Sequence, residues 1–179
     1  RDHGDDFNDV ELGGVADGVL LGGYETSASM LVMSTYLLSQ QPEAWAKLQT
    51  GTDEEVSAIV EELLRMLTPV QIAFARFARE DHELYGKHIR KGDPVLVSLL
   101  QANRDPDVTP DPDTFNPHRD NNGSHLAFGH GMHRCLGAEL LLRRFRLIGQ
   151  EEQFGVAQIG IDQRAPRERL SPDQRNLLA

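Results

Sequence analysis

The sequence of 179 residues contains one cysteine, few aromatic residues and no long apolar run. A single cysteine excludes an internal disulfide and is typical of a reducing compartment, so we expect a cytoplasmic protein. No apolar stretch approaches the roughly 20 residues that a helix needs to span a bilayer, so we expect no membrane segment. Positive charge is also scarce, with 18 lysines and arginines against 28 acidic residues, which argues against nucleic acid as a partner.

Length and apolar periodicity predict one domain over residues 1–179, mainly α-helical with small β-sheets, in an α+β fold. Segment 9–40 is dense in apolar residues and predicts one long, buried helix that ends before Pro42. Glycines interrupt the interior of this helix at five positions: Gly13, Gly14, Gly18, Gly22 and Gly23. Each costs about 0.8–1 kcal/mol relative to alanine in a helix, so we expect another element to approach this helix closely.

Two shorter helices are predicted next. The first covers 43–49, and the second begins at Thr52, which forms a capping box with Glu55. Apolar residues of the second helix recur on one face, and Glu62 and Arg65 lie on the face away from it.

After Pro69 the apolar period shortens towards two. This pattern predicts a strand over 70–77 and paired strands over 83–97 that are broken by glycine-containing turns. Residues 105–122 contain several prolines and aspartates and predict a long irregular segment, which in a compact domain usually serves a function.

The only cysteine, Cys135, lies in the glycine-rich segment 128–137, and a helix-forming run over 138–145 follows it directly. Backbone N–H groups are unpaired in the first turn of a helix, and the helix dipole favours an anion there. We therefore expect Cys135 to be a thiolate.

Four interpretations of Cys135 compete. A buried, inert cysteine would gain nothing from the flanking glycines and arginines. A catalytic nucleophile could use His133 as its base, but no third, orienting group is evident. A zinc site could combine Cys135 with His125, His130 and His133, although the usual short ligand spacings are missing. The fourth interpretation is a haem iron held by the cysteine thiolate.

The segment around Cys135 also carries a recognisable signature, made up of Phe128, Gly129, Gly131, His133, Cys135, Leu136 and Gly137. This pattern resembles the haem-binding signature of the cytochrome P-450 family, the haem-thiolate monooxygenases. The resemblance implies haem b as cofactor, with Cys135 as the axial ligand of the iron. It also implies that Phe128, Gly129 and Gly137 form part of the cofactor-binding loop.

Residues 22–26 resemble the part of the family's long central helix that crosses the distal face of the haem. The resemblance implies that Glu25 and Thr26 deliver protons during oxygen activation, and an unpaired Thr26 hydroxyl would suit that relay. The alternative is an ordinary solvent-facing turn of helix in which the Thr26 hydroxyl bonds a preceding carbonyl.

Glu62 and Arg65 match the family's Glu-x-x-Arg motif, and Arg119 matches the arginine of its irregular meander. The resemblance implies that these three side chains form one buried network that supports the cysteine loop. Taken alone, charges three residues apart on a helix usually form a weak surface ion pair. The resemblance further implies that Arg76 and His133 hold the haem propionates, whereas the alternative for Arg76 is a strand-edge arginine that faces water.

The resemblance is closest to the soluble bacterial members and implies that this chain is the C-terminal half of the cytochrome P-450 fold, without the N-terminal half. It implies insertion of one atom of O2 into a small hydrophobic organic substrate. Electrons would come from NAD(P)H through a ferredoxin or flavoprotein reductase. Two alternatives remain: a truncated, non-catalytic haem-binding remnant, and a haem-thiolate protein that uses peroxide or isomerises an oxygenated substrate.

Arginines are concentrated within and just after the cysteine loop: Arg134, Arg143, Arg144 and Arg146. Such a basic patch could attract an acidic redox protein. An ordinary charged helix face would look the same in the sequence.

Overall fold

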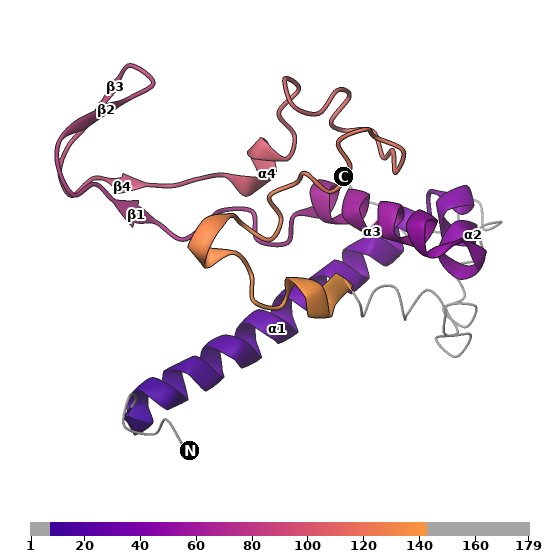
Figure 1. The fold of residues 1–179 in the computed structure, drawn as a ribbon, viewed down its shortest axis with the longest axis horizontal. Coiled ribbons are helices and arrows are strands. Elements are labelled where there is room, and N and C mark those ends of the chain that lie inside the picture. Colours follow the sequence, from indigo (N-terminus) through magenta and orange to yellow (C-terminus); the bar gives the residue numbers. More distant parts are fainter. Residues whose placement is uncertain (1–7, 143–179) are drawn as a thin grey trace, which may run out of the picture.

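The computed structural model of the protein describes residues 8–142 (Figure 1). Its elements follow the chain in this order: α1 Asp9–Leu38, α2 Pro42–Thr50, α3 Asp53–Leu67, β1 Arg76–Phe77, β2 His82–Leu84, β3 Lys87–Ile89, β4 Pro94–Val95, α4 Leu99–Ala102 and the 3₁₀ helix η1 Gly131–His133. Helices dominate and the sheets are small, as the sequence predicted. No helix among these residues is both long and apolar enough to cross a membrane.

Helix α1 begins and ends at local signals. The Asn8 side chain accepts hydrogen bonds from the N–H groups of Val10 and Glu11, and Glu11 accepts in return from the Asn8 N–H. This capping box satisfies N–H groups that the first turn leaves unpaired. The helix ends two residues before the predicted position, because the Gln40 N–H bonds the Leu37 carbonyl in a tighter turn.

Most of α1 is exposed, contrary to the prediction of a buried helix. Its buried residues are Met30, Ser34 and Leu38, all in its C-terminal part. The earlier turns expose large apolar side chains, namely Val10, Leu12, Val15, Val19, Leu20 and Leu21. All five of its glycines face open space. The energetic cost of these glycines led us to expect another element packed closely against them, but no described residue takes that place. Figure 1 shows α1 as a rod that meets α2 and α3 at its C-terminal end.

Helix α3 is the centre of the core. It starts with a capping box in which the Glu55 N–H bonds Thr52 Oγ1 at 3.3 Å and the Thr52 N–H bonds Glu55 Oε2 at 3.0 Å. The pKa of Glu55 lies below its ordinary value, chiefly because Lys47 donates a hydrogen bond to it. The apolar core gathers on this helix and comprises Met30, Leu38, Val56, Ile59, Val60, Leu63, Leu64 and Ala127.

The second face of α3 is buried as well, so the alternative of a weak surface ion pair between Glu62 and Arg65 is wrong. Glu62 is 0% exposed and Arg65 is 5% exposed, although they were assigned to the face away from the apolar stripe. The reason is that α4 and the irregular segment after it cover this face. Helix α3 is therefore packed on both sides, by apolar side chains on one and by polar groups on the other.

The sheets are shorter than predicted. Strands β1 and β4 pair antiparallel over two residues each, and the predicted strand over 70–77 is otherwise represented by a single bridge between Ile72 and Ser98. Between β1 and β4 the chain forms the hairpin β2–β3, closed by a turn in which Tyr85 and Gly86 have positive φ. Pro94 opens β4 and has no N–H to donate, but backbone bonding continues beyond it, where the Ala78 N–H donates to the Asp93 carbonyl at 3.0 Å.

Candidate functional site

The segment around Cys135 folds into a loop that bonds to itself. The Cys135 N–H donates to the Phe128 carbonyl at 2.8 Å, and the Arg134 N–H donates to the Gly131 carbonyl at 3.0 Å. Gly129 and Gly131 have φ of 70° and 71°, a conformation that strains residues with a Cβ atom. The signature glycines at these two positions are thus required by the backbone path of the loop.

The loop presents an uncovered face. Cys135 is exposed, and its neighbours Met132 and Leu136 are 93% and 100% exposed. Residues 138–142 form the helix that was predicted to follow, and Ala138 anchors it in the protein interior. The rest of the predicted run over 138–145 lies outside the described residues.

The donor set near Cys135 fits a haem iron better than a zinc ion. Among residues 8–142, no group of three or more His, Cys, Asp or Glu side chains is placed to hold a metal ion. A single thiolate is sufficient for an iron that brings its other ligands in a macrocycle, and exposed apolar side chains beside the sulfur suit a flat, apolar ring. The cysteine loop therefore fits haem.

The structure brings Glu62, Arg65 and Arg119 together. Arg65 Nε donates to Glu62 Oε2 at 2.7 Å and Arg65 Nη2 donates to Glu62 Oε1 at 2.9 Å. Arg119 Nε donates to the same Oε1 at 3.1 Å, and the Asn116 N–H adds a bond of 2.9 Å. Arg119 also bonds three carbonyls of the meander, those of Pro110, Asp111 and Thr114. One buried carboxylate thus fixes the course of the irregular segment on α3.

Asn103, to which the sequence assigned no role of its own, links this network to the cysteine loop. Arg65 Nη1 donates to the Asn103 carbonyl at 2.9 Å. The Asn103 side chain donates to Thr68 Oγ1 at 2.9 Å and accepts from the Leu126 N–H at 2.6 Å. Leu126 lies just before the loop. No sequence signal reveals Asn103, because its partners lie 23 to 38 residues away along the chain.

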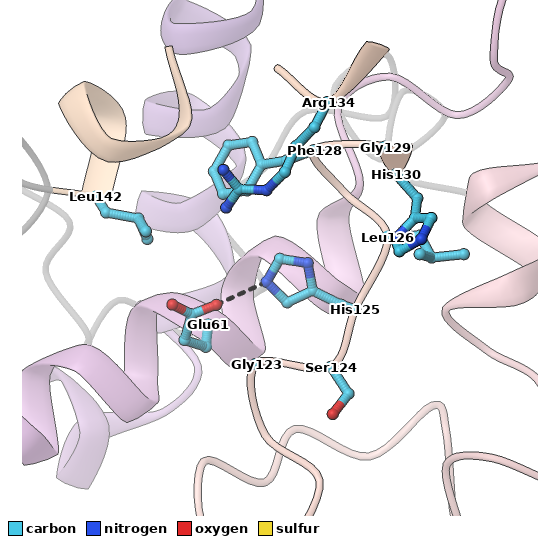
Figure 2. Close-up of a pocket in the computed structure, with 10 residues that line it drawn as sticks. All are labelled: Glu61, Gly123, Ser124, His125, Leu126, Phe128, Gly129, His130, Arg134 and Leu142. Carbon is cyan, nitrogen blue, oxygen red and sulfur yellow. Dashed lines mark hydrogen bonds and ion pairs between the residues drawn. The ribbon is translucent and has the colours of Figure 1, made fainter. Parts of the chain in front are cut away.

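A second contact that was missed joins α3 to the same stretch. His125 Nε2 lies 2.8 Å from Glu61 Oε2, where the two residues border a pocket of about 270 Å³ beside the cysteine loop. Figure 2 shows the imidazole directed at this carboxylate, with Phe128 and Arg134 on the far side of the pocket. The sequence suggested His125 only as a possible zinc ligand.

The proposed propionate ligands are both exposed. Arg76 lies in β1 and donates to the Phe74 carbonyl at 2.9 Å, and His133 ends η1 next to the cysteine loop. Arg134 lies 3.7 Å from Glu139, while Arg143, Arg144 and Arg146 lie outside the described residues. The roles of Arg76 and His133 stay predictions.

On α1, Glu25 is exposed and Thr26 is half-buried. The Thr26 hydroxyl donates to the Gly22 carbonyl at 2.5 Å, so the expectation of an unpaired hydroxyl is wrong. The reason is local, because a threonine inside a helix can reach the carbonyl four residues earlier.

We predict that Glu62→Gln destabilises the protein by about 3–5 kcal/mol, because it removes the charge that two buried guanidiniums require. The measurement is the free energy of unfolding in urea. Glu54→Gln, on an exposed glutamate of the same helix, is the matched control. A loss at Glu62 no larger than that of the control would contradict the assigned role of this carboxylate.

Comparison with known proteins agrees with this geometry. The sequence model of the cytochrome P-450 family matches residues 1–141. Nocardicin C N-oxygenase of Nocardia uniformis subsp. tsuyamanensis is 46% identical over 141 residues, which are 77% of this chain and 35% of that protein. Mycinamicin IV hydroxylase/epoxidase of Micromonospora griseorubida is 43% identical over 141 residues, with 78% and 35% covered.

Solved structures give the same result. The crystal structure of OxyC, a cytochrome P-450 implicated in an oxidative C–C coupling reaction during vancomycin biosynthesis, matches with a TM-score of 0.77 and 40% identity. The match covers 83% of this chain and 38% of that one. The chain therefore spans about a third of the length of the relatives that it matches. By both sequence and fold, this chain belongs to the cytochrome P-450 family.

Proposed function

We propose that the protein is a haem-thiolate monooxygenase that inserts one atom of O2 into a small hydrophobic organic substrate. The observation that carries this proposal is the exposed Cys135, presented by a glycine-bent loop and braced from α3 by a buried polar network. Nocardicin C N-oxygenase and mycinamicin IV hydroxylase/epoxidase, both named as oxygen-transferring enzymes, support it.

The chain supplies residues that would hold haem b. Cys135 would ligate the iron as a thiolate, with Phe128, Gly129 and Gly137 lining the ring and Arg76 and His133 binding its propionates. When bound, the haem supplies the oxygen chemistry, and the thiolate donates the electron density that favours O–O cleavage. Glu62, Arg65 and Arg119 would hold the loop that positions the sulfur.

Glu25 and Thr26 are the residues that would hold and transfer protons during oxygen activation. Because the Thr26 hydroxyl donates to the Gly22 carbonyl, its oxygen is left to accept a hydrogen bond from water. Thr26 would thus orient a water molecule, and the exposed Glu25 carboxyl would exchange protons with solvent. Electrons would come from NAD(P)H through a ferredoxin or flavoprotein reductase.

The alternative of a non-catalytic haem-binding remnant is the weaker proposal. Among residues 8–142 nothing covers the large apolar side chains that α1 exposes on several faces between Val10 and Leu21. Contiguous apolar surface of that kind normally marks a place where another part of a protein packs.

The thiolate ligand is tested by a carbon monoxide difference spectrum of the protein expressed from its complete gene and loaded with haem. We expect the red-shifted Soret band of thiolate ligation, and we expect Cys135→Ala to lose it. Met132→Ala, which changes another exposed side chain of the loop, should keep the band. A thiolate band in Cys135→Ala would refute the proposal.

The role of Thr26 is tested by Thr26→Ala, with Thr35→Ala as the matched control. Thr35 lies on the same helix and makes the same kind of bond, to the Leu31 carbonyl at 2.8 Å. We expect Thr26→Ala to lower the product formed per NAD(P)H consumed by about a hundredfold, the low end of what general acid–base catalysis contributes to a reaction step. Equal losses in the two variants would assign Thr26 a purely structural role.

A further inference from the structure

His125 occupies a buried position next to α3. Its side chain is 3% exposed, and its Nε2 lies 2.8 Å from Oε2 of Glu61, which borders the pocket in Figure 2. Glu61 precedes Glu62 in α3, but the bonds of the two carboxylates go to different side chains. The contact of His125 with α3 is therefore separate from the Glu62 network.

The second ring nitrogen of His125 also has a partner. The Ala127 N–H donates to His125 Nδ1 at 3.2 Å. An amide N–H can only donate, so Nδ1 carries no proton in this arrangement. The ring proton lies on Nε2 and is donated to Glu61. The two contacts thus specify one neutral tautomer and one ring orientation.

These contacts fix the backbone that leads into the cysteine loop. The Leu126 N–H donates to Asn103 Oδ1 and the Ala127 N–H donates to His125 Nδ1, while the Gly129 N–H donates to the Leu126 carbonyl at 2.8 Å. Two adjacent amides are therefore held by two side chains. The His125 side chain bonds Glu61 of α3, and the Asn103 side chain bonds Thr68, the residue that caps the C-terminal end of α3.

Ring contacts continue from His125 to the residue before the cysteine. The rings of His125 and Phe128 are tilted by 50° with centroids 6.0 Å apart. The guanidinium carbon of Arg134 lies 5.9 Å from the centroid of the Phe128 ring, within the range of a cation–π contact. A path of direct contacts thus runs from Glu61 on α3 to Arg134, the neighbour of Cys135 in the chain.

We propose that Glu61 and His125 form a positioning pair that sets the entry of the cysteine loop and, through it, the placement of the Cys135 sulfur. The pair acts in addition to the Glu62 network. Neither residue touches the sulfur, so both act through Ala127 and Phe128. The consequence for iron ligation rests on the proposed haem-thiolate function, whereas the effect on the loop does not.

The test uses the haem-loaded protein expressed from its complete gene. His125→Phe keeps an aromatic ring against Phe128 and removes both polar contacts. Glu61→Gln keeps an oxygen that can accept the Nε2 proton, and Glu61→Leu removes it. Glu54→Gln, on an exposed glutamate in the first turn of α3, is the matched control.

We expect amide hydrogen exchange at Ala127 to be at least about tenfold faster in His125→Phe, with Leu126 still protected by Asn103. The reduced carbon monoxide complex of this variant should lose the thiolate Soret band several-fold faster on standing. Glu61→Gln and Glu54→Gln should match the wild type. Combining Glu61→Leu with His125→Phe should add nothing to His125→Phe, because residues that act as one unit are not additive.

Unchanged exchange at Ala127 in His125→Phe would overturn the proposal, and so would strictly additive effects of the two substitutions. If the variants do not fold, the ¹⁵N chemical shifts of the His125 ring in the wild type test the proposal. A proton on Nδ1 would contradict it, because Nδ1 must then donate and could not accept from the Ala127 N–H. A wild type without a thiolate band would instead refute the haem-thiolate function. The rate of amide hydrogen exchange at Ala127 would still test whether Glu61 and His125 position the loop.

Discussion

The structure depends on one buried charge, the carboxylate of Glu62. It has no access to water, so it is stable only with its full set of donors, two guanidiniums and a backbone N–H. Those donors come from α3 itself and from the irregular meander. Pairing this charge therefore fixes where the meander runs. Because the meander leads directly into the cysteine loop, the same constraint determines where Cys135 is presented.

The cysteine loop thus has one side that is bonded to α3 and another side that is exposed. On the bonded side, Arg65, Asn103, Glu61 and His125 connect α3 to the backbone just before the loop. On the exposed side, the loop presents Cys135 with its apolar neighbours, and α1 exposes its glycines. A rigid support behind the loop limits the movement of Cys135, which would suit the thiolate ligation proposed for it.

Much of the fold could be predicted because its signals are local. The capping box at Thr52, the turn at Gly86 and the glycines of the cysteine loop each depend on residues only a few positions apart. The burial of Glu62 depends on Arg119, 57 residues away, so periodicity could not reveal it and only the family resemblance implied it. The bridge through Asn103 and the pair Glu61–His125 depend on partners up to 64 residues away, and neither pairing was predicted. The Thr26 hydroxyl was mispredicted because a bond within its own helix was available.

The most direct test of this account is the persistence of the thiolate Soret band in Asn103→Ala, measured on the reduced carbon monoxide complex of the haem-loaded protein. Asn103 never touches the loop's sulfur, yet it joins α3 to Leu126. We expect several-fold faster loss of the band in this variant, with no change in Asn121→Ala, whose amide bonds the Val108 carbonyl away from the loop. A band as persistent in Asn103→Ala as in the wild type would contradict the claim that α3 holds the cysteine in place.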